Sequence, residues 1–175
     1  MEYLVKKAQQ GDQAAFTELI KQNTQSLYKV ARSYLNSEED IADAIQDTIL
    51  VCFEKIHGLK EARYFKTWLT RILINKCNDI LKQGKRMVAV EDVPEKVNQH
   101  SYEDELVFED LMHFLDDKYR IVLTLYYVER FKTSEIAQIL EVSENTVKTR
   151  LVRGRKEFAY HYYIGDEKIV GGGQL

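Results

Sequence analysis

The sequence is poor in the residues that break helices and build tight turns. Its 175 residues include one proline and eight glycines, and three of those glycines are consecutive at 171–173. A β-sandwich or barrel needs many more turn residues, so this scarcity favours an all-α fold. Hydrophobic residues make up 45% of the chain, which is the share of an ordinary globular protein and excludes extensive disorder.

Cysteine, histidine and long apolar runs are also scarce. Cys52 and Cys77 cannot build a disulfide framework, and their apolar surroundings indicate a reduced compartment. The four histidines are scattered, with no CxxC pair and no glycine-rich phosphate loop, so we expect no metal, cofactor, small-molecule substrate or enzymatic activity. No apolar run approaches the roughly 20 residues of a membrane span, and the amino terminus lacks a signal-peptide layout. The expected location is therefore the cytoplasm, without direct membrane insertion.

The net charge of −3 conceals strongly charged segments. Residues 54–86 contain nine bases and three acids, and residues 144–156 contain five bases and one acid. In contrast, residues 36–53 contain five acids and no base, and residues 87–110 contain eight acids and one base. The two basic segments predict two surfaces that face a polyanion, whereas solvated helix faces are the alternative for either segment alone.

Apolar periodicity predicts two helical domains, over residues 1–86 and 104–164. Between them, residues 87–103 contain Pro94 and no helical period, which predicts a flexible acidic linker. The last residues, 165–175, are expected to be disordered.

Capping residues divide these domains into helices. Gly11-Asp12 interrupts the first helical stretch, and Asp12 and Ser37 are expected to cap the two helices that follow them. A stop is expected at His57-Gly58. The expected helices cover 13–35, about 38–56, 65–83, 104–115, 118–131, 134–140 and 144–163.

The strongest motif is a helix-turn-helix over residues 133–156. Val142 is expected to fill the turn and Ser143 to cap the second helix, while Glu141 stands where many such turns carry glycine, which predicts mild strain. The inner positions are Ile136, Ala137, Leu140, Val147 and Leu151. The outward positions, which suit a helix in the DNA major groove, are Asn145, Lys148, Thr149, Val152 and Arg153, with Arg150, Arg155 and Lys156 as phosphate-binding candidates.

Three motifs in order resemble the extracytoplasmic-function (ECF) family of RNA polymerase sigma factors. Residues 40–50 read DIADAIQDTIL, residues 65–75 read FKTWLTRILIN, and residues 146–155 read TVKTRLVRGR. The resemblance covers about residues 4–158. It implies a promoter-melting domain followed by a helix-turn-helix domain, and a transcription initiation factor for an envelope or stress regulon.

The resemblance also implies which residues of the first domain bind which partner. Asp43, Gln46, Asp47 and Leu50 match the helix that docks on the β′ coiled coil of core RNA polymerase, and their spacing puts them on one helix face. The segment 59–75 matches the part of the family that opens the minus-10 element and captures a flipped base. Its implied DNA contacts are Lys60, Arg63, Tyr64, Lys66 and Asn75, although the loop sequence KEAR over 60–63 departs from the family's pattern.

In the second domain, the resemblance implies recognition of the minus-35 element. Lys148, Thr149, Val152 and Arg153 match the base-reading positions, and Arg150 and Arg155 match positions that contact the DNA backbone. Further implied partners are promoter DNA, the β flap of the polymerase and an anti-sigma factor, which is often membrane-bound in this family.

A stand-alone helix-turn-helix regulator is the alternative function. It explains the residues from about 104 onward but not the acidic and basic helices before them. The response regulators that carry such output domains also have α/β receivers, whose strand pattern is missing from this sequence.

Overall fold

The computed structural model describes the backbone of residues 1–88, 111–112 and 114–170, and the side chains of these residues outside 84–88 and 164–170. Within these ranges every regular element is helical and none is a strand. The predicted all-α fold is therefore confirmed.

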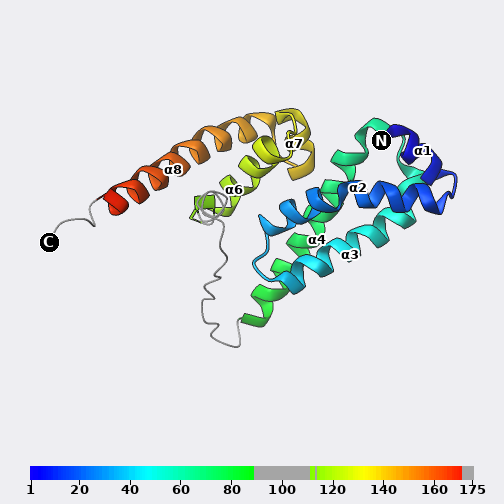
Figure 1. Ribbon diagram of the computed structural model, residues 1–175, viewed down its shortest axis with the longest axis horizontal. Helices are drawn as coiled ribbons and strands as arrows, with labels where there is room; N and C mark the ends of the chain where they lie inside the picture. Colours follow the sequence, from blue (N-terminus) through cyan, green and yellow to red (C-terminus); the bar gives the residue numbers. More distant parts are fainter. Residues whose placement is uncertain (89–110, 113, 171–175) are drawn as a thin grey trace.

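Four helices build the first half of the molecule, residues 1–88 (Figure 1). They are α1 (Glu2–Gln9), α2 (Gln13–Arg32), α3 (Glu38–Lys55) and α4 (Phe65–Val88). Two 3₁₀ turns, η1 (Ile56–Gly58) and η2 (Ala62–Tyr64), connect α3 to α4. Helices α2, α3 and α4 pack together, and their buried side chains include Leu19, Leu27, Ile41, Leu69 and Leu73.

Both predicted caps of this half are present. The Asp12 carboxylate accepts a hydrogen bond from the Ala15 amide at 3.0 Å, and the Ser37 hydroxyl accepts one from the Asp40 amide at 3.3 Å. Gly11, with a φ of 89°, takes the left-handed conformation that glycine adopts without a Cβ penalty. The boundaries of α2 and α3 at their amino-terminal ends therefore follow from local sequence alone.

The second half, described over residues 111–112 and 114–170, contains three α-helices and a π-helical turn. They are α6 (Asp117–Leu123), the π turn η3 (Thr124–Val128), α7 (Thr133–Leu140) and α8 (Glu144–Val170). Helix α8 packs against both α6 and α7, and Leu125, Ile136, Ile139 and Val147 are buried among them. This packing makes α7 and α8 the predicted helix-turn-helix.

Several predicted helix ends are wrong. Helix α4 continues to Val88, past the expected end at 83 and into the expected linker, because no proline interrupts the chain before Pro94. The backbone of α8 is helical to Val170, so residues 165–170 do not belong to a disordered tail. The expected helix 118–131 changes to π-helical hydrogen bonding at Thr124.

Other predictions concern, wholly or in part, residues that the structure does not describe. The linker from residue 89 onward and residues 104–110 and 113 of the expected helix 104–115 lie there. The last five residues, 171–175, lie there too. Leu111 and Met112 are helical, whereas residues 114–115 form a turn and a bend in place of the expected helix end.

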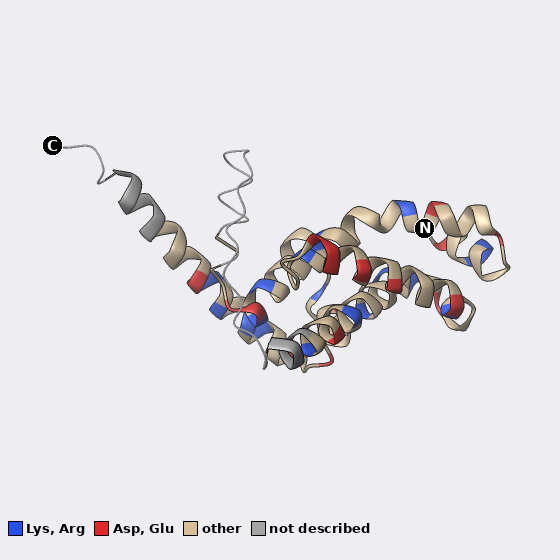
Figure 2. Ribbon diagram, turned by 90° about the horizontal axis from the view of Figure 1, so that it is seen from below, with Lys and Arg blue, Asp and Glu red and all other residues tan. Residues whose placement is uncertain are grey.

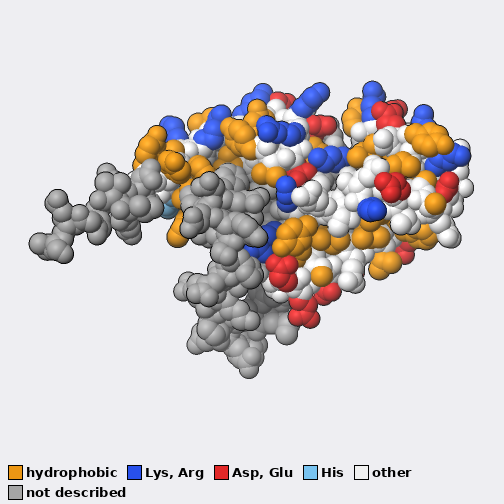
Figure 3. Space-filling model, viewed as in Figure 1, with side chains coloured by type: hydrophobic (Ala, Val, Ile, Leu, Met, Phe, Trp, Pro, Cys, Tyr) orange, Lys and Arg blue, Asp and Glu red, His pale blue; other side chains and the backbone are white. Residues whose placement is uncertain are grey.

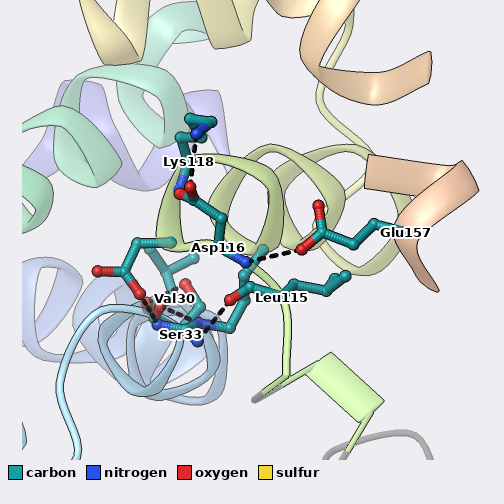
Figure 4. Close-up of polar contacts among 8 residues, drawn as sticks. Val30, Ser33, Leu115, Asp116, Lys118 and Glu157 are labelled. Atoms are coloured by element: carbon teal, nitrogen blue, oxygen red, sulfur yellow. Dashed lines mark hydrogen bonds and ion pairs between the residues drawn. The ribbon is translucent and has the colours of Figure 1, made fainter. Parts of the chain in front are cut away.

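The two halves are in direct contact. Buried apolar side chains of both halves form one continuous cluster, in which α7 packs against α4 and η3 packs against α2. Figure 4 shows a polar part of this junction, where Ser33 at the end of α2 lies beside Leu115 and Asp116. Arg120, which is itself buried, donates from Nε to the Ser33 carbonyl oxygen at 2.9 Å and thereby joins α6 to α2.

Gly154 is required for the close crossing of α8 over α6. A Cβ at this position would lie 3.1 Å from the Tyr119 Cβ and 3.2 Å from the Leu123 Cδ1. Overpacking of this kind costs about 1–3 kcal/mol, more than the ~0.5–1 kcal/mol that alanine gains over glycine inside a helix. We expect Gly154→Ala to lower the free energy of unfolding by about 1 kcal/mol in urea denaturation.

Gly58→Ala is the matched control, because a Cβ there meets no atom within 4 Å. Its stability is expected to stay within about 0.5 kcal/mol of the parent chain. Equal stability of the two variants would contradict the proposed crossing.

Candidate nucleic-acid and protein interfaces

The turn between α7 and α8 is fixed by hydrogen bonds at both helix ends. The Ser143 hydroxyl accepts from the Thr146 amide at 3.1 Å, as predicted, and the Thr133 hydroxyl donates to the Glu144 carboxylate at 2.8 Å. Val142 is half-buried in the turn, and its amide donates to the Ala137 carbonyl oxygen at 3.1 Å. These bonds fix α8 relative to α7, so the side chains of its outer face project in a defined direction.

The outer face of α8 carries the predicted DNA-reading residues. Blue Lys and Arg segments follow one another in the amino-terminal part of this helix (Figure 2). Arg150 is half-buried, and the remaining predicted contacts are exposed, with Val152 at 46%. The exposed set is Asn145, Lys148, Thr149, Val152, Arg153 and Arg155. This mixture of donors and one apolar group can meet base edges in a major groove.

Two of these cations are already oriented by neighbours. The Lys148 ammonium lies 3.0 Å from the Glu144 carboxylate, one helical turn away. Hydrogen bonds from Thr133 and then from Lys148 lower the pKa of Glu144. Arg155 donates to the Leu151 carbonyl oxygen at 3.2 Å and to the Tyr127 hydroxyl at 3.4 Å, which aims its guanidinium along the helix surface.

The five residues predicted for the minus-10 element do not form one cluster. Arg63 lies over the Tyr64 ring, 4.9 Å from its centroid, and both side chains are exposed together with Lys60. Lys66 points instead to the second half, where its ammonium lies 3.1 Å from the Glu129 carboxylate. Asn75 is exposed further along α4 and lines a cavity between the halves.

This cavity has a volume of about 340 Å³ and is lined by residues of both halves. Asn75 and Asn78 of α4 face it from one side, and Lys118 and Arg150 face it from the other. Tyr34 also lines it, and burial raises the pKa of its hydroxyl. A predicted minus-10 residue and a predicted minus-35 residue thus line the same cavity.

The predicted polymerase-docking residues lie on the exposed face of α3. Asp43, Gln46, Asp47 and Leu50 are all exposed, Leu50 at 62%, and the Asp47 carboxylate lies 3.2 Å from the Lys76 ammonium of α4. A carboxylate and amide stripe with an apolar side chain suits a protein partner better than DNA.

Phe53 extends this face, although it is not among the docking residues that the family resemblance implies. Its ring is 54% exposed and contacts Phe16 edge-on at 5.2 Å. The spacing from Leu50 to Phe53 is one helical turn, so the pattern that selected the other docking residues also includes this one.

The described residues contain no group of three or more metal-ligating side chains, and no described helix is long and apolar enough to cross a membrane. Lys and Arg side chains project along one edge of the surface, across both halves (Figure 3).

The chain is similar to known proteins along most of its length. The family patterns described as Sigma-70 region 2 and Sigma-70, region 4 match residues 19–87 and 106–158, respectively. The RNA polymerase sigma factor SigV of Bacillus subtilis (strain 168) is 29% identical over 153 residues, which are 86% of this chain and 92% of that protein. The ECF RNA polymerase sigma factor SigW of the same strain is 29% identical over 170 residues, 87% and 91% of the two chains.

Two solved structures share the fold. CnrH, in complex with the cytosolic domain of CnrY, superposes with a TM-score of 0.69 at 24% identity and covers 93% of this chain and 97% of its own. The sigma factor RpoE in complex with the anti-sigma factor NepR from Bartonella quintana also has a TM-score of 0.69, at 20% identity, with coverage of 91% and 98%.

The two cysteines are expected to be inert in the native protein. Both side chains are fully buried, and desolvation raises the pKa of Cys52 and of Cys77 to about 12 in each case. Because the thiolate is the nucleophile, a thiol reagent at pH 8 should modify neither residue in buffer and both in denaturant. Gln138→Cys, at an exposed position of α7, should add one fast-reacting thiol. Fast modification of the parent chain in buffer would contradict this burial.

Proposed function

This chain belongs to the ECF group of the sigma-70 family of RNA polymerase sigma factors, and we propose that it directs core polymerase to promoters through three surfaces. The first is the α3 face, the second is the segment from η2 into α4, and the third is the outer face of α8. One observation carries the proposal: the part of the chain that matches region 2 exposes the acid and amide face of α3, and the part that matches region 4 exposes the basic outer face of α8.

The outer face of α8 is proposed to read the minus-35 element. Lys148, Thr149, Val152 and Arg153 contact base edges, and Arg150 and Arg155 bind phosphates. Asn145, at the start of α8, adds a donor and an acceptor near the groove. The hydrogen bonds that fix α8 against α7 support this role, because base readout requires a defined helix orientation.

The segment from η2 into α4 is proposed to bind the opened minus-10 element. The Arg63–Tyr64 stack offers a ring face beside a cation, which suits an unstacked base next to a phosphate. Lys60 and Lys66 supply further positive charge, and Asn75 supplies hydrogen bonds to a base edge. Strand opening here is a binding process, so no covalent step is assigned to the chain.

An anti-sigma factor is the proposed regulator, and the cytoplasm is the proposed location. The structure of RpoE was determined in complex with the anti-sigma factor NepR, and this chain shares its fold. Such a partner, if membrane-bound, would keep the chain at the inner face of the membrane by binding, without insertion.

Run-off transcription from a promoter library tests the proposal as a whole. Transcripts that require both core polymerase and this chain, and that share two upstream motifs at fixed spacing, support a sigma factor. Sequence-specific duplex binding without such transcripts would favour the stand-alone regulator instead.

Arg153→Ala is expected to weaken promoter binding by the assembled holoenzyme by about 1–3 kcal/mol and to relax specificity at one base pair of the minus-35 element. Arg155→Ala is the matched comparison on the same helix. Because Arg155 is a proposed phosphate contact, its removal should weaken binding to DNA of every sequence equally and reduce the salt dependence of binding. Competition binding with single-base variants of the element measures both effects. Unchanged base preference in Arg153→Ala would remove this residue from the readout.

Gln46→Ala combined with Asp47→Ala is expected to reduce affinity for core polymerase about tenfold while the far-UV circular dichroism stays the same. Glu18→Ala combined with Gln22→Ala is a chemically matched control, because these residues form an exposed acid–amide pair on α2 with a hydrogen bond of 2.9 Å. A fluorescence titration with core polymerase compares the two double variants. Equal affinities would refute docking through α3.

A further inference from the structure

Helix α1 has no part in the three surfaces of the proposed function, and it precedes the region 2 match at residues 19–87. It packs against α2 and against η1 and η2, the two 3₁₀ turns that lead into α4 (Figure 1). Val5 and Ala8 of its inner face are buried there. Helix α1 therefore lies against the segment that carries the proposed minus-10 contacts.

One side chain of α1, Gln9, binds this segment directly. Its Nε2 donates to the Ile56 carbonyl oxygen at 2.9 Å and to the Leu59 carbonyl oxygen at 2.7 Å. A side-chain amide has two N–H donors, so both are used in this contact. Gln9 is half-buried, and within the described part of the chain no backbone amide donates to the Leu59 oxygen. The Gln9 amide thus supplies a donor that the backbone of the segment lacks.

The bonds of Gln9 connect two parts of the segment that its own backbone leaves unconnected. The Leu59 amide closes η1 on the Ile56 oxygen at 3.1 Å, and the Tyr64 amide closes η2 on the Glu61 oxygen at 3.0 Å. Between the turns the chain is extended, with ψ 109° at Leu59 and ψ 108° at Glu61. Gln9 binds η1 at one carbonyl and the extended part at the other. It therefore fixes the direction in which the chain leaves η1.

The end of α1 from which Gln9 projects is itself fixed. The Gly11 amide donates to the Ala8 carbonyl oxygen at 3.0 Å, and the Asp12 amide donates to the Lys7 carbonyl oxygen at 3.1 Å. These bonds close the chain around Gln9 on both sides. A side chain that is supported in this way can hold a neighbouring segment in one geometry.

We propose that Gln9 is a positioning residue for strand opening, whose amide holds residues 56–64 in the arrangement that receives the unpaired minus-10 strand. A segment that is ordered before binding loses less conformational entropy when it captures a strand, so capture is tighter. Gln9 needs no contact with DNA, because it acts through the backbone of Leu59, next to the exposed Lys60. The positioning itself rests on the contacts alone, whereas its consequence for DNA rests on the proposed function.

Hydrogen exchange of the free, full-length chain tests the positioning. Gln9→Met keeps the length of the side chain and removes both donors, whereas Gln9→Glu keeps its shape and replaces the donors by acceptors. Both variants should accelerate exchange of the Leu59 and Tyr64 amides about three- to tenfold, with no change at residues 69–73 of α4. Gln10→Met is the matched control at an exposed neighbouring position, and its rates should stay within about twofold of the parent chain.

Two exchange results would overturn the positioning. Unchanged rates at Leu59 and Tyr64 in both Gln9 variants would show that the segment does not depend on the amide. Equal acceleration at residues 69–73 would show that Gln9 stabilises the whole first half and not this segment.

Binding of the assembled holoenzyme to a fork DNA tests the consequence. The fork carries the two motifs that the run-off library yields, with the minus-10 strand unpaired, and a duplex of the minus-35 motif alone is the comparison. Gln9→Met should bind the fork about three- to tenfold more weakly and the duplex with unchanged affinity, a difference that general loss of folding would not produce. Gln10→Met should bind both DNAs as the parent chain does.

The two measurements separate this proposal from the proposed function. Faster exchange at Leu59 with unchanged fork affinity would overturn the role of Gln9 in strand capture and leave the minus-10 assignment intact. A parent holoenzyme that binds the fork no more tightly than the minus-35 duplex would contradict the minus-10 assignment itself, and with it that role. The exchange rates would then still decide whether Gln9 holds the segment.

Discussion

A carboxylate that is removed from water must receive donors from the protein, and Glu129 receives them from two helices of the other half of the chain. Ser26 on α2 and Lys66 on α4 satisfy it, so its burial depends on α2, α4 and η3 being in contact at one point. The left-handed Arg130 that follows then turns the chain toward α7. The position of the helix-turn-helix against α4 is thus linked to the burial of one charged group.

Apolar burial and polar contacts have different roles at this junction. The continuous cluster of buried side chains supplies the attraction, but hydrophobic contact is non-directional and does not by itself select one orientation of two helical units. The ion pairs and the Arg120 bond to Ser33 are directional and select the observed orientation. The polar contacts, and not the apolar cluster, therefore define how the two halves are oriented.

Local signals account for what the sequence predicted correctly. Asp12, Ser37 and Ser143 cap helices through hydrogen bonds to residues three positions further on, and the helical period of apolar residues identified the inner face of the helix-turn-helix. The structure differs where the deciding contact is distant in sequence. Phe53 is an apolar residue of α3, yet its ring is 54% exposed and contacts Phe16 of α2 edge-on. The sequence marks Lys66 as a candidate DNA contact but does not reveal that Glu129, which lies 63 residues away, is beside it.

Glu141 combines a local sequence signal and a contact that is distant in sequence. Sequence alone marks it as an unexpected occupant of a turn, because the cost of a positive φ is local and independent of the rest of the fold. The contact that offsets this conformational cost is not local, since its partner Arg71 lies 70 residues away in the sequence. An exposed ion pair contributes at most about 1 kcal/mol, no more than the strain of a single left-handed residue, so Glu141 adds little net stability to the contact between the halves. What it adds is dependence on salt, because dissolved ions screen an exposed ion pair.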